Sequence, residues 1–303
     1  MQSHNETGPP ALWSIGLVLL TGTLAVSTAA PLARLATAST DSSPLGFSLV
    51  MAATRMGLAA IVFLPVWRKI IDRPPAIIAW RWAVIAGVAL ALHFASWLTS
   101  LSYTSIVAST TLVTTSPLWV ALFTWGWQGV APRRLTCLGM GFALIGSFLI
   151  GSDGSSASPT HAPLLGNTLA LIGAIAASLY FLSGRLAQQQ GLSIRHYAAI
   201  AYTTAAIVLL PLPIVCGADY FSYSCNTYSY LGLMALVPQI IGHTSLNWAM
   251  RWVSPLFVTL VILLEPVFAG FLGFFLFQEQ PGLWMMLGAG VLLIGIAIAA
   301  RDQ

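Results

Sequence analysis

Charged side chains are scarce in this 303-residue sequence. Asp, Glu, Lys and Arg together make up 7% of it, whereas hydrophobic residues make up 57%. Soluble domains carry roughly 25% charged residues, which help to cover a water-exposed surface. Most of the surface of this chain must therefore face lipid. The formal net charge of +4 does not indicate a nucleic-acid partner, because the basic residues lie in short loops between apolar runs.

Cysteine and the usual catalytic motifs are also rare or absent. Three cysteines exclude a disulfide scaffold. Cys216 and Cys225 share one loop and can pair if that loop faces an oxidising compartment, but two free thiols fit equally well. The sequence has no Gly-Lys-Ser/Thr phosphate loop, no His-x-x-Glu-His and no Gly-x-Ser-x-Gly. We therefore expect no cofactor, no metal, no ATP-driven step and no enzyme activity.

Long apolar runs take the place of charge. A helix needs about 20 apolar residues to cross a bilayer, and lipid cannot satisfy exposed backbone groups, so a helix is required. No alternation typical of a membrane β-barrel occurs. We predict an all-α integral membrane protein with ten transmembrane helices, near residues 11–32, 45–66, 80–101, 105–127, 134–151, 163–184, 196–216, 229–249, 254–277 and 281–300.

The distribution of basic residues predicts the orientation. With the N-terminus inside, the outside loops hold only Arg34, and the inside loops hold Arg68, Lys69, Arg73, Arg81, Arg133, Arg134, Arg185, Arg195, Arg251 and Arg301. The positive-inside rule then predicts that both termini lie in the cytoplasm. The expected location is the inner membrane of the cell. The polar, Gly/Ser-rich stretch 152–162 is expected to be a periplasmic linker.

An internal repeat appears when the chain is shifted by 149 residues. The coincident positions are Ser96 and Ser245, Pro117 and Pro266, Pro132 and Pro281, Gly139 and Gly288, Gly141 and Gly290, and Gly146 and Gly295. Arg34-Leu35-Ala36 matches Arg185-Leu186-Ala187 at a slightly different offset. Each predicted half, 1–151 and 163–303, has five spans, so the second must be inverted relative to the first. Inverted repeats of this kind build many secondary transporters.

One stretch resembles a known family. Residues 242–255, Gly-His-Thr-Ser-Leu-Asn-Trp-Ala-Met-Arg-Trp-Val-Ser-Pro, are followed by Leu264-Glu265-Pro266 and by a Glu at 279. With the first-half counterpart 103–118, this pattern resembles the EamA-like families of the drug/metabolite transporter superfamily. The resemblance covers about 14–300, and it implies ten helices, cytoplasmic termini and export or exchange of small metabolites.

We therefore predict a secondary transporter that works by alternating access. Its substrate would be a small metabolite such as an amino acid or an amphipathic or cationic compound, with proton coupling as an open hypothesis. The expected partners are this substrate and the bilayer, and a homodimer is a further hypothesis. A membrane channel and a membrane-embedded enzyme are the alternatives, although neither a filter loop nor a ring of charge is visible.

Ionisable residues inside apolar runs are the first candidates for the site. A charge at the bilayer centre costs about 2.5–3.5 kcal/mol, so such residues should face protein or water. Glu265 directly precedes Pro266, which removes a backbone hydrogen bond and should loosen the helix. Pro266 and its counterpart Pro117 are therefore predicted hinges. Glu265 is a predicted binding group, and the alternative is a protonated Glu that is hydrogen-bonded to a neighbouring helix. Arg55 is expected to pair within the protein or to contact carbonyls.

Two polar faces complete the predicted cavity. His93 and Trp97 share one helix face, and His243 and Asn247 share another, because each pair is four residues apart. Interhelical hydrogen bonding without substrate remains the alternative for both. Further candidates are the possible stacking residues Tyr180 and Trp248 and the hydroxyl residues Thr111 and Thr115. A lipid-interface position is the alternative for Trp97 and Trp248. Gly139, Gly141, Gly288 and Gly290 are predicted to allow close helix approach.

Overall fold

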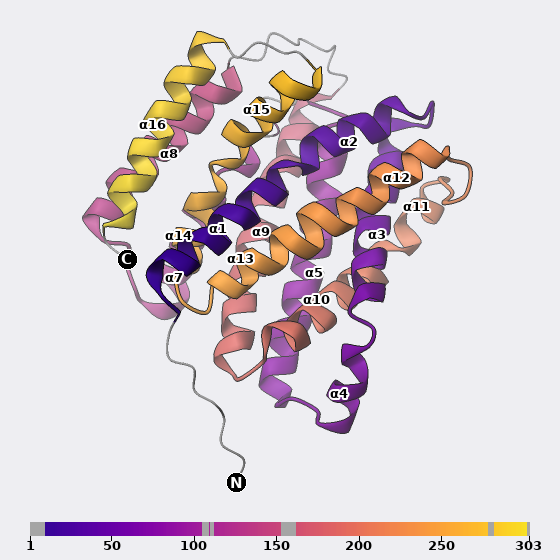
Figure 1. The fold of residues 1–303 in the computed structure, drawn as a ribbon, viewed down its shortest axis with the longest axis horizontal. Helices are drawn as coiled ribbons and strands as arrows, with labels where there is room; N and C mark the ends of the chain where they lie inside the picture. The colour runs from indigo at the N-terminus through magenta and orange to yellow at the C-terminus, as the bar shows by residue number, and fades with distance from the viewer. Residues whose placement is uncertain (1–9, 105–108, 110–111, 153–161, 278–281, 302–303) are drawn as a thin grey trace.

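The computed structural model describes residues 10–104, 109, 112–152, 162–277 and 282–301, and these residues are helical with short connections (Figure 1). The first half contains α1 (Leu12–Ser27), α2 (Ala29–Ala38), α3 (Pro44–Val62), α4 (Val66–Asp72), α5 (Ile77–Ser100), α7 (Ser116–Gln128) and α8 (Arg134–Ser152). The second contains α9 (Pro163–Gln189), α10 (Ile194–Leu209), α11 (Pro211–Val215), α12 (Cys225–Met234), the π-helix η1 (Ala235–His243), α13 (Thr244–Ala249), α14 (Pro255–Ile262), α15 (Glu265–Phe277) and α16 (Leu283–Ala300).

Local sequence signals set many of these boundaries. Proline occupies the first turn of α3, α7, α9, α11 and α14, where its missing N–H removes no helical hydrogen bond. Serine side chains accept a backbone N–H at the start of α10, α12 and α14. Gly129, at the end of α7, adopts a positive φ of 68° that other residues rarely tolerate.

Six stretches among the described residues are long and apolar enough to cross a membrane. They are Leu12–Ala38, Leu45–Val62, Ile77–Ser100, Pro163–Gln189, Ile194–Val215 and Pro255–Leu276. Two shorter apolar helices cover Arg134–Ile150 and Met286–Ala300. Multiple helices with the length and apolar composition of membrane spans are therefore observed. Of the ten predicted spans, the one at 105–127 falls partly outside the described residues, and the one at 229–249 is divided among α12, η1 and α13.

The packing is typical of a protein in lipid. Large apolar side chains are exposed along the outer helices, as at Leu164 (82%) and Phe275 (70%), whereas alanines fill the core between α5 and α10. There, a Cβ atom on Gly87 would lie 2.5 Å from the carbonyl oxygen of Ala201. Small residues thus bring the helix backbones close together, as membrane helix packing requires.

α8 and α16 lie side by side at one edge of the molecule (Figure 1). Gly139 contacts Gly295, and Gly146 contacts Gly288, so the two helices run antiparallel. Gly288 and Gly295 are the counterparts of Gly139 and Gly146 at the 149-residue shift. Each glycine therefore meets the counterpart of the other, which is the contact pattern of a two-fold axis. A Cβ on Gly141 or on Gly290 would meet nothing within 4 Å among the described residues, so the close approach predicted for them is not to a described helix of the same chain.

A second pair of contacts repeats between the halves. A Cβ on Gly22 of α1 would lie 3.1 Å from Ser245 Cβ of α13, and one on Gly173 of α9 would lie 3.3 Å from Ser96 Oγ of α5. Ser96 and Ser245 are 149 residues apart, and Gly22 and Gly173 are 151 apart, the offset of Arg34 and Arg185. The glycine of the first half therefore contacts the serine of the second half, and the glycine of the second half contacts the serine of the first half.

Several helices predicted as continuous are interrupted. The predicted span 254–277 breaks after Ile262, and α15 restarts at Glu265 with Pro266 in its first turn. In the first half, a turn at Thr114 and Thr115 precedes α7, which begins at Ser116 with Pro117 in its first turn. Both prolines thus start a helix after a break rather than bending one, because a proline N–H is not needed there.

Candidate functional site

The rings of Phe94 and His243 meet near the middle of the helix bundle. Their centroids lie 5.6 Å apart in an edge-to-face arrangement, and the two residues are counterparts at the 149-residue shift. The ring of His243 also lies near Tyr180, at 6.0 Å, and Phe181, at 6.5 Å. His243 is buried, and its Nδ1 atom has no hydrogen-bond partner within the part of the chain that the structure describes.

His93 and Trp97 share a face of α5, as their spacing predicts. Their rings stack nearly parallel, with 6.0 Å between centroids and 4° between planes. His93 Nδ1 lies 2.9 Å from the carbonyl oxygen of Gly173, so it links α5 to α9. Trp97 is buried among the helices rather than exposed on their outer surface, and its Nε1 atom lacks a partner among the described residues.

A buried hydrogen-bond network joins α9 to α13. Asn247 Nδ2 donates to the hydroxyl of Tyr180, and Gln188 Nε2 donates to the backbone carbonyl of Asn247 at 2.9 Å. Tyr180 and Asn247 are almost fully buried. The predicted polar faces of α5 and α13 therefore meet the same helix, α9.

Arg55 of α3 and Gln239 of η1 lie at the centre of this arrangement. The Arg55 side chain is fully buried, and its Nε atom donates to Gln239 Oε1 at 2.9 Å. Its guanidinium carbon lies 4.2 Å from the centroid of the Phe94 ring, a cation–π contact. The pairing expected for Arg55 is thus with a side-chain amide and an aromatic face. Sequence reasoning missed Gln239, although an amide beside Pro238 inside an apolar run was a usable signal.

Glu265 and the two prolines lie at helix breaks. Glu265 is partly buried in the first turn of α15. Its carboxylate attracts the Arg55 guanidinium electrostatically. Glu265 therefore belongs to the charge environment of Arg55, and Pro117 and Pro266 mark equivalent interruptions in the two halves.

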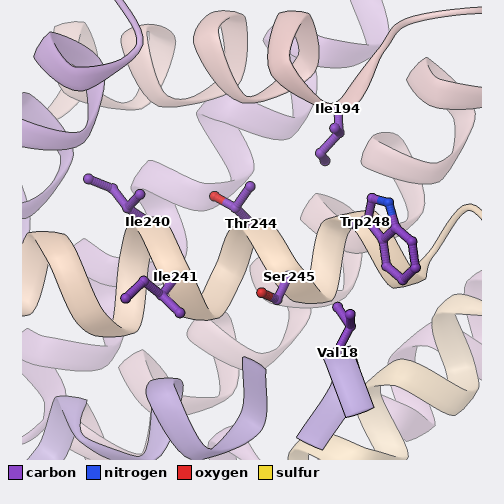
Figure 2. A pocket seen from close by; sticks show the side chains of 7 residues that line it. All are labelled: Val18, Ile194, Ile240, Ile241, Thr244, Ser245 and Trp248. Atoms are coloured by element: carbon purple, nitrogen blue, oxygen red, sulfur yellow. The ribbon is translucent and has the colours of Figure 1, made fainter. Parts of the chain in front are cut away.

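The described contacts of Trp248 and Thr115 are with other residues. Trp248 lines a groove of about 330 Å³ beside η1 and α13, together with Val18, Ile194, Ile240, Ile241, Thr244 and Ser245 (Figure 2). Thr115 Oγ1 donates to the Leu112 carbonyl at 2.6 Å and accepts from Trp119 Nε1 at 3.2 Å. Thr111 lies outside the described residues. Among the described residues, Trp248 therefore lines the groove and Thr115 contacts Leu112 and Trp119, and none of these contacts is with His243.

Eight buried polar atoms have no hydrogen-bond partner in the described part of the protein, and most belong to this arrangement. They are Arg55 Nη1 and Nη2, Trp97 Nε1, Gln188 Oε1, Tyr197 Oη, Gln239 Nε2, His243 Nδ1 and Asn247 Oδ1. A buried unsatisfied polar group costs about 1–3 kcal/mol. Among the described residues, no group of three or more His, Cys, Asp or Glu can hold a metal ion, and Cys216 and Cys225 are both free and exposed.

Comparisons with known proteins agree with this architecture. A protein of Archaeoglobus fulgidus described as an uncharacterized transporter is 23% identical over 242 residues, which cover 78% of this chain and 81% of that protein. A protein of known crystal structure superimposes with a TM-score of 0.72 at 18% identity, covering 96% of this chain and 98% of the other. This second likeness concerns the fold alone.

The family assignment has the widest coverage. The profile of the EamA-like transporter family matches residues 13–152 and again residues 164–301. These matches point to a transporter rather than an enzyme. With its apolar helices, the chain is a multi-pass membrane protein that belongs to the EamA-like transporter family.

Proposed function

We propose that the protein is a secondary transporter that moves small metabolites, such as amino acids or amphipathic or cationic compounds, by alternating access. The observation that carries this proposal is the set of buried polar atoms without partners around Arg55, His243 and Asn247. These atoms come from both halves of the chain, and a polar substrate or water that reached them would satisfy them. The substrate-binding residues of the proposal are His93, Trp97, Tyr180, His243, Asn247 and Glu265, with Thr111, Thr115 and Trp248 as the more distant candidates.

The proposed architecture has ten spans in two inverted repeats. The bounds are 1–151 and 163–303, joined by the linker 152–162. Support comes from the antiparallel packing of α8 on α16, whose glycine contacts are exchanged as a two-fold axis requires, and from the two successive family matches. Alternating access would then be a rocking of one half against the other. Pro117 and Pro266 are the proposed hinges, because each stands at a helix break.

The proposed topology places both termini in the cytoplasm of the inner membrane. In Figure 1, α4 and the turn between α9 and α10 lie toward the lower edge, whereas the loops after α2 and between α11 and α12 lie at the upper right. Arg68 lies in α4, and Arg195 lies in the first turn of α10, directly after the turn that follows α9, as the positive-inside rule requires for the cytoplasmic side. In a cysteine-free variant, Arg68→Cys and Arg195→Cys should be labelled from the same side. Labelling from opposite sides would rule out the inverted arrangement.

Saturable counterflow in proteoliposomes tests the transport proposal. Saturable flux with counterflow favours a carrier over a channel, because only a carrier can move labelled substrate uphill while unlabelled substrate moves the other way. Proton coupling through Glu265 or a histidine is a separate hypothesis. Glu265→Gln should abolish the dependence of uptake on a pH gradient, and His196→Gln, in a residue at the start of α10, is the matched control. Transport that ignores both the gradient and Glu265→Gln would reject proton coupling and leave the carrier proposal intact.

A further inference from the structure

We propose that Arg55 and Gln239 form a subsite for a carboxylate group, so that the transported compound carries a carboxylate. This inference rests on the transport proposal above. It concerns a fully buried guanidinium in α3 and a buried amide in η1, two side chains that the repeat does not relate to each other.

The hydrogen bond between the two side chains fixes which atoms stay available. Arg55 Nε can only donate, so the oxygen of the Gln239 amide must face it, as the 2.9 Å contact with Oε1 shows. The amide nitrogen of Gln239 is thereby left as a donor. Arg55 Nη1 and Nη2 have no hydrogen-bond partner among the residues described, and Gln239 Nε2 has none within hydrogen-bond distance, although the buried Tyr202 hydroxyl lies beside the amide. The side-chain nitrogens of the Arg55–Gln239 pair that face away from their mutual hydrogen bond are therefore all donors.

A guanidinium edge of this kind matches a carboxylate. The two oxygens of a carboxylate can accept two parallel N–H bonds from the Nη1 and Nη2 atoms, the strongest geometry for such a pair. The Phe94 ring covers the guanidinium at 4.2 Å, so a ligand must approach in the plane of the fork rather than from that face. Directional donors in a fixed plane favour a planar carboxylate over a neutral polar group.

The surrounding charges agree with an anionic ligand. Arg55 remains protonated at neutral pH, and a buried charge without a hydrogen-bonded counter-charge is costly in a membrane. The charged and titratable groups that interact with it are Glu265, Tyr180 and Tyr202, together with His93 and His243. Glu265 attracts Arg55 but is not among its hydrogen-bond acceptors in the described residues. The carboxylate could come from the substrate or, in another conformation, from Glu265; we assign it to the substrate.

The apolar part of the compound would lie against the neighbouring rings. Phe94, His243, Tyr180 and Phe181 form a continuous series of ring contacts beside the guanidinium. An amine on the same compound would be attracted by Glu265. The subsite therefore suits a carboxylate with an apolar or aromatic body better than a cationic amine alone.

Binding of matched acids and amides to the purified full-length protein tests the subsite. L-Phenylalanine and L-leucine should each bind about tenfold to a hundredfold more tightly than L-phenylalaninamide and L-leucinamide, the range expected for hydrogen bonds to a charged group. The Arg55→Gln variant should lose this preference, and Arg55→Lys should keep only part of it. Arg251→Gln, which removes an exposed cation after α13, should leave the preference unchanged.

Further arms keep the test decisive. If Arg55→Gln fails to fold, Gln239→Leu should still weaken binding of the acids by several-fold while leaving the amides unaffected. If the Glu265→Gln variant still binds the acids more tightly than the amides, the carboxylate at Arg55 comes from the substrate. If the Glu265→Gln variant loses this preference for acids while the Gln239→Leu variant keeps it, the assignment of the carboxylate to the substrate is overturned. Equal binding of acids and amides to the unaltered protein, or no binding of either acid, would overturn the subsite.

Counterflow of the same compounds separates this inference from the transport proposal. Saturable counterflow of an amide, unchanged by Arg55→Gln, would overturn the subsite but leave the transporter standing. An acid preference in binding, with no saturable flux of any compound, would overturn the transport proposal and leave the subsite as a binding site.

Discussion

Adding one methyl group at Gly146 should weaken the contact between α8 and α16. A Cβ there would lie 2.5 Å from the backbone nitrogen of Leu292 and 2.6 Å from the carbonyl oxygen of Gly288. Ordinary van der Waals contact begins at 3.4 Å, so the helices must separate by roughly 0.9 Å. Overpacking of this kind costs about 1–3 kcal/mol.

Gly141→Ala is the matched control for Gly146→Ala. Both glycines lie in α8, but a Cβ on Gly141 meets nothing within 4 Å among the described residues. Each substitution gains about 0.5–1 kcal/mol of helix stability from the loss of glycine, so this gain cancels in the comparison. Gly146→Ala should therefore be less stable than Gly141→Ala by about 1–3 kcal/mol.

Unfolding in mixed micelles by sodium dodecyl sulfate, followed by tryptophan fluorescence, measures this difference. The two-fold pattern further requires that Gly288→Ala be less stable than Gly290→Ala, because Gly288 is the partner of Gly146 and a Cβ on Gly290 is unobstructed in the described structure. Equal unfolding free energies within each pair would refute the close approach of α8 and α16.

Three other predictions follow from the described contacts. Asn247→Leu should lower the unfolding free energy by about 1 kcal/mol by removing the donor to Tyr180, and adding Tyr180→Phe should recover most of the loss; an unchanged stability in the single variant would contradict the hydrogen bond. Backbone and hydroxyl donors in the loop, including the N–H of Phe221, lower the pKa of Asp219, so this carboxylate stabilises the loop at neutral pH and stops doing so as the pH falls through its lowered pKa. Asp219→Asn should therefore speed amide hydrogen exchange at Phe221 at pH 7, and unchanged exchange would argue against the contact. Cys216 is exposed and free, so a membrane-impermeant maleimide should label it in intact spheroplasts if its loop faces the periplasm, and labelling only after lysis would oppose the proposed orientation.

Much of the fold follows from the sequence because lipid imposes simple rules. Low charge and long apolar runs require helices, and the 149-residue shift pairs Gly139 with Gly288 and Gly146 with Gly295 before any contact is known. Spacing of four residues also placed His93 beside Trp97, since helix geometry is local.

The interruptions were harder to predict. Glu265-Pro266 suggested a weakened helix, but the sequence could not indicate that α14 would end at Ile262 and α15 would begin anew. A proline is compatible with a bend inside a helix or with a new first turn, and packing against neighbouring helices selects between them. The π-helix η1 has a local cause visible in the sequence, because Pro238 lies inside it, but its packing against α1 and α3 is not contained in the pattern.

The sequence by itself determined that this chain spans a membrane repeatedly and carries two related halves, because composition and internal repetition are properties of the chain alone. Tertiary structure decided which polar residues meet. It joined Arg55 to Gln239 across 184 positions of sequence, brought Phe94 against its own counterpart His243, and left Trp248 on the groove outside that cluster. The physical reason is that the sequence shows every such residue in the same way, as a polar side chain within an apolar helix. Its hydrogen-bond partner comes from a distant helix, and only the packing of the helices decides which partner that is.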